Sequence, residues 1–310
     1  MTPLVSICIP TYNGEEFLSE CLNSAISQTY LNLEIIISDD NSQDKTLEIA
    51  ESFISKTTIP IRIFHHQPSG IGDNWNNCVE HANGDYIKFL FQDDTLEPRC
   101  VEKMVFAAQQ DHQIGMVFCK RSILTEPSDF NAEWMKNWVE HYSSLHTKWP
   151  NPLKEVNHGM SLLKSLTYRD LHHNYIGEPV CTLIKKSVVE EIGGFDNQFK
   201  QLIDVEAWYR IISKGRVAFI NETLASFRLH DKQLSFINKQ KGSQETSRLR
   251  RKLFKMKPFL FSERVSCDLQ VAIEQERLPL TVENKKSKLK NDFAVKILFT
   301  LRRIKSKLGL

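Results

Sequence analysis

Short apolar runs alternate with segments of helical period over the first 120 residues. Five runs rich in β-branched and aromatic residues predict strands, at 5–9, 33–38, 61–64, 86–91 and 116–119. Between them, apolar residues recur at spacings of three and four, at 17–26, 47–54, 75–82 and 100–108. This alternation predicts an α/β fold in which a mostly parallel central sheet is flanked by helices.

The alternation stops after residue 119. Residues 120–175 are rich in Trp and His, and we interpret them as a partly helical insertion that lies over a crevice at the strand ends. Its aromatic side chains serve either as packing residues or as sugar platforms. A strand returns at 180–184 and a helix at 208–212. From 236 onward the chain is helical and charged. We therefore expect a main domain at 1–235 and a peripheral helical C-terminal extension at 236–310.

Polar side chains gather directly after three of the predicted strands. Thr11 to Asn13 follow the first, Asp39 to Ser42 the second, and Asp93 and Asp94 the fourth. Ligands of open α/β sheets bind outside the carboxyl ends of the strands, so these clusters are expected to face one crevice. Each cluster taken alone is equally typical of a helix cap. Three clusters together favour a binding site.

Composition and cysteine usage narrow the class of protein. The chain has 310 residues, 41% hydrophobic and 25% charged, as in soluble globular proteins. It holds no uncharged apolar run long enough for a membrane span and no signal-peptide pattern at its start. Its seven dispersed cysteines form no CxxC pair, which argues against a zinc ribbon or a disulfide framework. We expect a cytoplasmic protein with reduced thiols.

Charge is concentrated near the C-terminus. Residues 285–310 hold nine Lys or Arg and one Asp, within a chain of net charge +2. Residues 293–310 predict a basic, imperfectly amphipathic helix, which either lies on the anionic inner face of a membrane as a peripheral contact or packs on protein. No nucleic acid partner is expected, because no reading helix, zinc module or RNA-binding signature accompanies the basic residues.

Two common nucleotide-binding signatures are missing. The sequence has no GxxxxGK[ST] motif, and Gly70-Ile71-Gly72 lacks the third glycine of GxGxxG. A P-loop enzyme and a dinucleotide-dependent dehydrogenase are therefore disfavoured. Carboxylates at strand ends would repel a nucleotide diphosphate unless a divalent cation bridged them, so Asp93 and Asp94 are a candidate metal site. The alternative is an exposed turn with two solvated aspartates.

Several segments together resemble the family 2 glycosyltransferases, an inverting group with the GT-A fold. They are VSICIPTYNGEEFLSECLNSAISQ, LEIIISDDNSQDKT, NGDYIKFLFQDD, IGGFD and IDVEAWYR, in the family's order across residues 3–230. The resemblance implies a nucleotide-sugar donor, most often a UDP-sugar. It places nucleotide contacts at Pro10, Thr11, Tyr12, Asn13, Glu15, Asp39, Asp40 and Ser42. Asn41 replaces a usual glycine, and asparagine tolerates the left-handed backbone that glycine would supply.

The resemblance departs from the family at the metal motif. Members commonly read DxDD, whereas this chain has Phe91 in place of the first aspartate. Asp93 matches the aspartate expected to reach the metal. Asp94 would orient Asp93 without contacting the metal itself. The implied cofactor is a divalent cation, Mg or Mn, because both favour oxygen ligands.

The resemblance implies a general base at Asp204. The segment Asp204-Val205-Glu206-Ala207-Trp208-Tyr209-Arg210 matches the family's [E]D-x-[DE]-L-W-x-R motif. Glu206 is a secondary candidate, and Trp208 and Arg210 are assigned with it to the acceptor and diphosphate side. A helix N-cap is the alternative role for Asp204.

Two further segments extend the match. Glu178, in a GEP segment, would line the acceptor side. Arg228 and His230 form an R-x-H segment that would meet the departing diphosphate, with His230 binding phosphate or metal unless it is an ordinary packing residue.

The sequence thus predicts a metal-dependent inverting glycosyltransferase that moves a sugar onto a glycan or lipid-linked acceptor in surface polysaccharide assembly. One rival is a non-catalytic nucleotide-sugar or glycan-binding module, motivated by Phe91. Another is nucleotidyl transfer, although the glycine- and lysine-rich triphosphate signature of such enzymes is missing.

Overall fold

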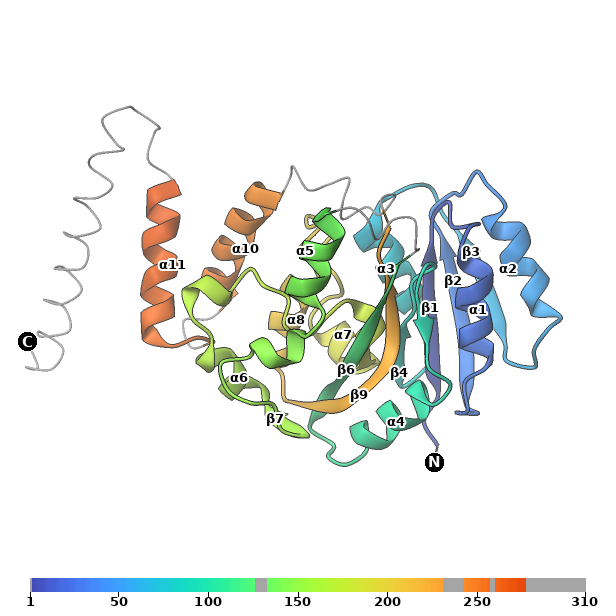
Figure 1. Ribbon diagram of the computed structural model, residues 1–310, viewed down its shortest axis with the longest axis horizontal. Helices are drawn as coiled ribbons and strands as arrows, with labels where there is room; N and C mark the ends of the chain where they lie inside the picture. Colours follow the sequence, from blue (N-terminus) through green and yellow to red (C-terminus); the bar gives the residue numbers. More distant parts are fainter. Residues whose placement is uncertain (1, 126–132, 231–241, 257–259, 277–310) are drawn as a thin grey trace, which may run out of the picture.

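The computed structural model describes residues 2–125, 133–230, 242–256 and 260–276 (Figure 1). The basic region 285–310, with the predicted amphipathic segment 293–310 inside it, lies outside these residues. Within the described part, no helix combines the length and apolar character that a membrane crossing needs.

Nine strands of the described chain form one sheet, in the order β3-β2-β1-β4-β8-β6-β9-β5, with β7 paired to β9. The four parallel pairs, among them β1 with β2 and β6 with β9, are longer than the four antiparallel ones. The strands are β1 (Val5–Thr11), β2 (Leu33–Asp39), β3 (Ile61–His65), β4 (Tyr86–Phe89), β5 (Thr95–Leu96), β6 (Ile114–Leu124), β7 (Val156–His158), β8 (Thr182–Lys185) and β9 (Arg216–Arg228).

Helices cover both faces of this sheet. In chain order they are α1 (Leu18–Ile26), α2 (Thr46–Ile54), α3 (Ile71–His81), α4 (Cys100–Ala108), α5 (Glu133–Tyr142), α6 (Gly159–Ser165), α7 (Lys186–Glu191), α8 (Ile203–Ile212), α10 (Gly242–Met256) and α11 (Glu263–Glu276), with short 3₁₀ turns η2 (Leu145–Lys148), η3 (Tyr168–Asp170) and η4 (Pro179–Cys181). The predicted alternation of strands and helices over the first 120 residues is confirmed.

Two hydrophobic cores lie on opposite faces of the sheet. Successive strand residues point to opposite faces, so Ile7 and Ile9 of β1 pack with α1, α2 and α4, whereas Cys8 belongs to the other core. The β1 side chains on both faces are fully buried, because a sheet covered by helices on both faces has no solvated side. This explains why the strands read as continuous apolar runs rather than as alternating ones.

The insertion and the extension both differ in part from expectation. Residues 120–124 continue β6, and the insertion adds the edge strand β7 to its helices. Helices α10 and α11 lie at the opposite end of the molecule from α1 and α2 (Figure 1). They are not peripheral to the main core, because Leu249 and Leu253 of α10 are buried in the same cluster as Trp208 of α8.

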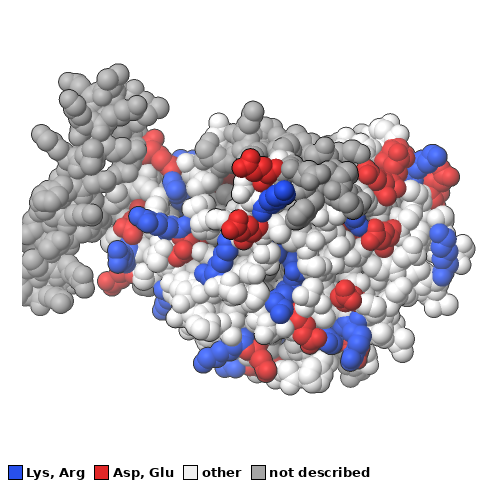
Figure 2. Space-filling model, viewed as in Figure 1, with Lys and Arg blue, Asp and Glu red and all other residues white. Residues whose placement is uncertain are grey.

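Charge and thiols follow simple patterns in the described residues. Figure 2 shows acidic and basic side chains interspersed over the described part of one face. The seven cysteines are free thiols, and all but Cys267 are buried.

Candidate active site

A cleft of about 770 Å³ opens at the carboxyl ends of β1 and β4. Its walls come from the end of β1, the start of α8, the aromatic residues of the insertion and the residues that follow β9. The predicted residues that line it are Pro10, Thr11, Tyr12, Asn13, Asp93, Glu178, Asp204 and His230. Segments separated by about 200 residues in the sequence therefore meet at one crevice. The first and third predicted strand-end clusters contribute to it, through 11–13 and Asp93, whereas the second, 39–42, does not line it.

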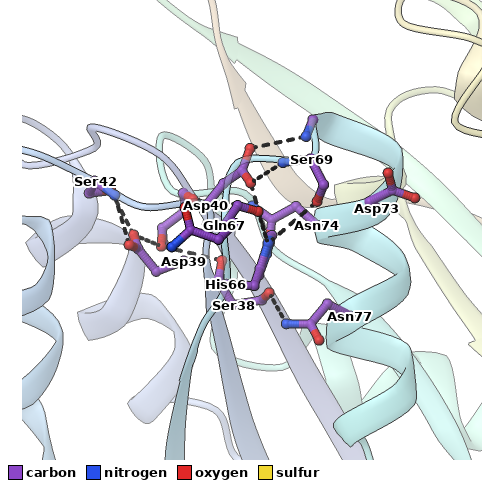
Figure 3. Close-up of polar contacts among 12 residues, drawn as sticks. Ser38, Asp39, Asp40, Ser42, His66, Gln67, Ser69, Asp73, Asn74 and Asn77 are labelled. Atoms are coloured by element: carbon purple, nitrogen blue, oxygen red, sulfur yellow. Dashed lines mark hydrogen bonds and ion pairs between the residues drawn. The ribbon is translucent and has the colours of Figure 1, made fainter.

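Asp39 joins the ends of β1 and β2. Its Oδ2 accepts hydrogen bonds from Thr11 Oγ1 at 2.8 Å and Ser42 Oγ at 2.6 Å, and its Oδ1 accepts from the Ser42 amide at 2.8 Å (Figure 3). The residue has no exposed surface. A buried carboxylate is tolerated only where its oxygens are satisfied, and here three donors satisfy it. Asp39 thus supports the loop after β2 and does not itself line the cleft.

Asp40 lies beside the turn that begins α3. Its Oδ1 accepts from the Ser69 amide at 2.9 Å and its Oδ2 from the Gly70 amide at 3.3 Å, with His66 Nδ1 3.4 Å from Oδ1 (Figure 3). Asp40 therefore anchors the 69–70 turn against β2. The next residue, Asn41, has φ 68°, which confirms the left-handed backbone expected at that position.

Gln92 is a site residue that sequence reasoning missed. Its amide pairs with the Tyr12 backbone in both directions: the Tyr12 amide donates to Oε1 at 2.8 Å, and Nε2 donates to the Tyr12 carbonyl at 3.1 Å. This bridge ties the end of β1 to the loop that carries Asp93. Glu15, by contrast, does not line the cleft and accepts from the Lys45 amide at 3.0 Å.

Phe91 occupies the position of the missing first carboxylate. Its ring stacks on Trp75 with centroids 5.1 Å apart and planes 27° apart, and both rings line the cleft. Offset aromatic pairs of this kind contribute packing beyond their buried area. The side chain gives the cleft an apolar wall at this point and offers no ligand to a cation.

Asp93 and His230 form the candidate metal pair. Their Oδ2 and Nε2 atoms lie 3.1 Å apart, and both residues line the cleft. Among the described residues His230 Nδ1 is buried without a hydrogen-bond partner, and no group of three His, Cys, Asp or Glu residues gathers. The Asp93 oxygen suits Mn²⁺ or Mg²⁺ when diphosphate oxygens and water complete the coordination, and the imidazole nitrogen favours Mn²⁺ of the two. The residues present therefore fit a cation that is shared with a donor.

Asp94 and Arg228 lie behind that pair. Asp94 has no exposed surface, its Oδ1 accepts from the Arg228 amide at 2.9 Å, and burial next to Asp93 raises its pKa well above the usual range. The Arg228 guanidinium donates to the Asp93 carbonyl at 3.0 Å and to Glu20 at 2.6 Å, over the Phe17 ring. Neither residue lines the cleft, so Arg228 braces the Asp93 loop instead of facing the diphosphate.

Asp204 lies in the first turn of α8 and faces the cleft. Its Oδ2 accepts from Asn174 Nδ2 at 2.7 Å, and its Oδ1 accepts from the Val205 amide at 2.7 Å. Burial raises the pKa of Asp204 to about 7, and the nearby Glu178 carboxylate adds to that increase. A carboxylate with a pKa near neutrality is suited to accept a proton at physiological pH. Asn174 is a second residue that sequence reasoning missed.

Glu178 lines the cleft and is paired with Arg121. The two side chains form a bidentate ion pair, and the Arg121 side chain is only 3% exposed. Arg121 also donates to the Tyr142 carbonyl at 3.0 Å, and its guanidinium lies 5.8 Å from the Trp138 ring. The pair therefore links β6, the turn before β8 and α5 of the insertion.

Glu206, Trp208 and Arg210 do not lie on the acceptor side of the cleft, contrary to expectation. Glu206 is 0% exposed and pairs with Arg210 through contacts of 2.5 and 2.6 Å. Trp208 is buried, and its indole donates to the Gly177 carbonyl at 3.1 Å. These side chains point into the core from the helix that presents Asp204, so they hold the helix in place and do not contact a ligand.

Two curated relatives are similar over most of the chain. An uncharacterized protein of Mycobacterium tuberculosis is 31% identical over 229 residues, which are 74% of this chain and 67% of that protein. An uncharacterized glycosyltransferase of Rickettsia typhi is 30% identical over 234 residues, which are 75% and 66% of the two chains. The chain thus spans about two thirds of the length of these relatives.

Solved structures share the fold at low sequence identity. TarS of S. aureus in complex with UDP-GlcNAc has a TM-score of 0.58 at 14% identity, over 81% of this chain and 67% of TarS. The mannosyltransferase PcManGT from Pyrobaculum calidifontis, in complex with GDP-Man and Mn²⁺, has a TM-score of 0.56 at 16% identity, over 96% and 81%. The architecture is therefore the expected GT-A fold. Because the family model "Glycosyl transferase family 2" matches residues 6–193, more than half of the chain, this protein belongs to that family and is a glycosyltransferase.

Proposed function

We propose that the protein transfers a sugar, with inversion, from a nucleotide diphosphate donor to a hydroxyl of a glycan or lipid-linked acceptor. The observation that carries the proposal is the position of Asp204, a carboxylate with a pKa of about 7, in the same cleft as the strand-end residues and the Asp93–His230 pair. A UDP-sugar is the proposed donor, following the family resemblance and the UDP-GlcNAc complex of TarS.

Asp204 acts as the general base in this proposal. Its carboxylate takes the proton of the acceptor hydroxyl as that oxygen attacks the anomeric carbon, and the bond from that carbon to the diphosphate oxygen breaks. Single displacement gives a β-linkage from an α-donor. The Asn174 amide, 2.7 Å from Oδ2, fixes the orientation of the carboxylate, while Glu178 next to it favours proton uptake.

The opposite wall of the cleft holds the donor. Thr11 to Asn13 contact the nucleotide, and Asp39 and Gln92 keep that strand end in place. Asp93 and His230 would hold Mg²⁺ or Mn²⁺ together with the donor diphosphate. A cation bound there supplies positive charge to the departing diphosphate. The Mn²⁺ in the PcManGT complex supports this assignment.

The acceptor and the cellular setting are proposed from the family resemblance and from composition. A cytoplasmic enzyme of surface glycan assembly, held at the inner membrane face by 293–310, fits the family resemblance and the basic composition of that segment. A nucleotide-sugar or glycan-binding module is the second candidate function. It is favoured by Phe91, which stacks on Trp75 where relatives commonly carry a metal-binding aspartate.

One assay tests the metal, the donor and the base. Nucleoside diphosphate release is measured from UDP-, GDP- and dTDP-sugars, with and without Mn²⁺, for the native chain and for Asp204→Asn. We expect Mn²⁺-stimulated release from one donor and its loss in the variant. Tight nucleotide-sugar binding without turnover, even with candidate glycan acceptors added, would favour the binding module. Failure to bind any of these donors would refute sugar transfer from them and the nucleotide-sugar-binding module, and would leave only glycan binding.

A further inference from the structure

Glu245, at the start of α10, binds three consecutive backbone amides in front of α8. Its Oε1 accepts from the Lys200 amide at 3.0 Å, and its Oε2 accepts from Gln201 at 2.9 Å and Leu202 at 3.0 Å. Glu245 is 5% exposed. Lys200, Gln201 and Leu202, here called the 200–202 turn, all line the cleft.

This contact holds the turn that leads into α8. The N-cap residue Leu202 has no side chain able to accept a hydrogen bond, and α8 shows no side-chain cap of its own. A local cap would accept from amides in the first helical turn. Glu245 instead accepts from the three amides just before α8, at the end of the helix where its dipole favours a carboxylate.

Helix α10 itself is held firmly. Leu249 and Leu253 are buried in the core that also contains Ile203 of α8. About two turns after Glu245 on α10, Lys252 lies 2.8 Å from Glu206 and 2.5 Å from Asp196. Helix α10 thus contacts the α8 region at two levels, first at the backbone of the 200–202 turn and then at the buried Glu206 carboxylate.

We propose that Glu245 is a positioning residue for the transfer reaction: by fixing the 200–202 turn, it sets where the first turn of α8 presents Asp204 to the cleft. The inference rests on the proposed role of Asp204 as the base. It makes α10 part of the catalytic unit, although α10 lies outside the 6–193 region that the family model matches. A displacement of about 1 Å at a reacting group can cost about 10²-fold in rate.

The test combines amide hydrogen exchange with steady-state kinetics on the full chain. Glu245→Ala removes both acceptor oxygens, and Glu245→Gln keeps the side-chain volume and one of them. Ser247→Ala is the matched control, because it removes a 2.7 Å bond from α10 to Glu276 of α11 without touching the 200–202 turn.

In Glu245→Ala we expect exchange at amides 200–202 to accelerate at least about tenfold. We also expect kcat to fall about 10- to 100-fold while the donor KM changes less than about threefold. Glu245→Gln should recover part of kcat, and Ser247→Ala should match the native chain in both readouts. A merely structural role would lower only the folded fraction, which reduces the apparent kcat at unchanged KM. We therefore calculate kcat per folded molecule, using the folded fraction measured by circular dichroism. A value per folded molecule equal to that of the native chain would reject the positioning role.

Three results would overturn the inference: unchanged exchange at 200–202 in Glu245→Ala, faster exchange with kcat within twofold of native, or an equal loss of kcat in Ser247→Ala. If the native chain turns over no donor, the proposed function fails, but the exchange experiment still decides whether Glu245 fixes the turn. Faster exchange supports that contact, and unchanged exchange rejects it. Should Glu245→Ala not fold, Glu245→Gln provides the same comparison.

Discussion

Replacing Asp204 by asparagine should slow sugar transfer and stabilise the fold at the same time. The substitution keeps the shape of the side chain but removes the charge and the proton-accepting oxygen. A positioned general base contributes about 10²- to 10⁴-fold, so the rate with a saturating acceptor should fall by that factor, or about 3 to 5 kcal/mol of activation free energy. The native rate should rise with pH and level off above about 7, the pKa of Asp204.

The raised pKa of Asp204 also determines how the stability of the fold depends on pH. Raising the pH increases the transfer rate but lowers the stability. Asp204 binds its proton more tightly in the folded chain than in the unfolded one, where aspartate has a pKa of about 3.9. Stability from this group is complete below that value and is lost as pH rises through about 7. Because the side chain is half-buried, we discount the full shift to on the order of 1 to 3 kcal/mol. Asp204→Asn should recover this amount at pH 8.

Product release is followed by coupled detection of the nucleoside diphosphate, and stability by urea unfolding at pH 5 and pH 8. Asp111→Asn is the control: it removes an aspartate charge, paired to Arg216 at 2.7 Å, from a residue that does not line the cleft. A variant that transfers sugar within tenfold of native, or that is no more stable than native at pH 8, would refute the reasoning about Asp204.

Three further variants probe the rest of the molecule. His230→Ala should raise the Mn²⁺ concentration needed for half-maximal turnover at least about tenfold, measured by Mn²⁺ titration; an unchanged requirement would remove it from the metal site. Gln92→Ala loses both bonds to the Tyr12 backbone, at 2.8 and 3.1 Å, and should raise the donor KM several-fold with little change in unfolding temperature, as steady-state kinetics and thermal melts will report. Gly159→Ala places a Cβ 1.9 Å from the Ile212 carbonyl oxygen and should destabilise the fold by about 3 kcal/mol or more in urea unfolding; a normal urea midpoint would contradict that contact.

The features that the sequence predicted correctly are those encoded locally. Strand and helix periods are written in neighbouring residues, so the five strands and four helices predicted in the first 120 residues were assigned correctly, although the two-residue strand β5 was missed. The clustering of polar residues at strand ends placed Thr11 and Asp93 in one cleft. The left-handed backbone at Asn41 followed from residue chemistry alone.

The features that escaped prediction depend on partners far along the chain. Gln92 reaches a backbone 80 residues away, and Asn174 reaches Asp204 across 30 residues. Nothing in a local pattern indicates which polar side chain will cap which distant turn. Glu206 is different, because its spacing of four residues from Arg210 is a known helical ion-pair pattern. That spacing could have indicated an ion pair between the two side chains instead of a substrate contact.

The long-range closure of the site has a consequence for how the protein is made. His230 meets Asp93 across 137 residues, and Glu245 reaches Lys200 across 45. Such contacts give a high contact order, so the cleft is completed late in folding. During synthesis the N-terminal strands can collapse on their own core well before α10 leaves the ribosome. Under the proposed function, a nascent or prematurely terminated chain would therefore hold the nucleotide-facing strand ends without a positioned base. Donor sugar would then be protected from wasteful hydrolysis until α10 has been synthesised.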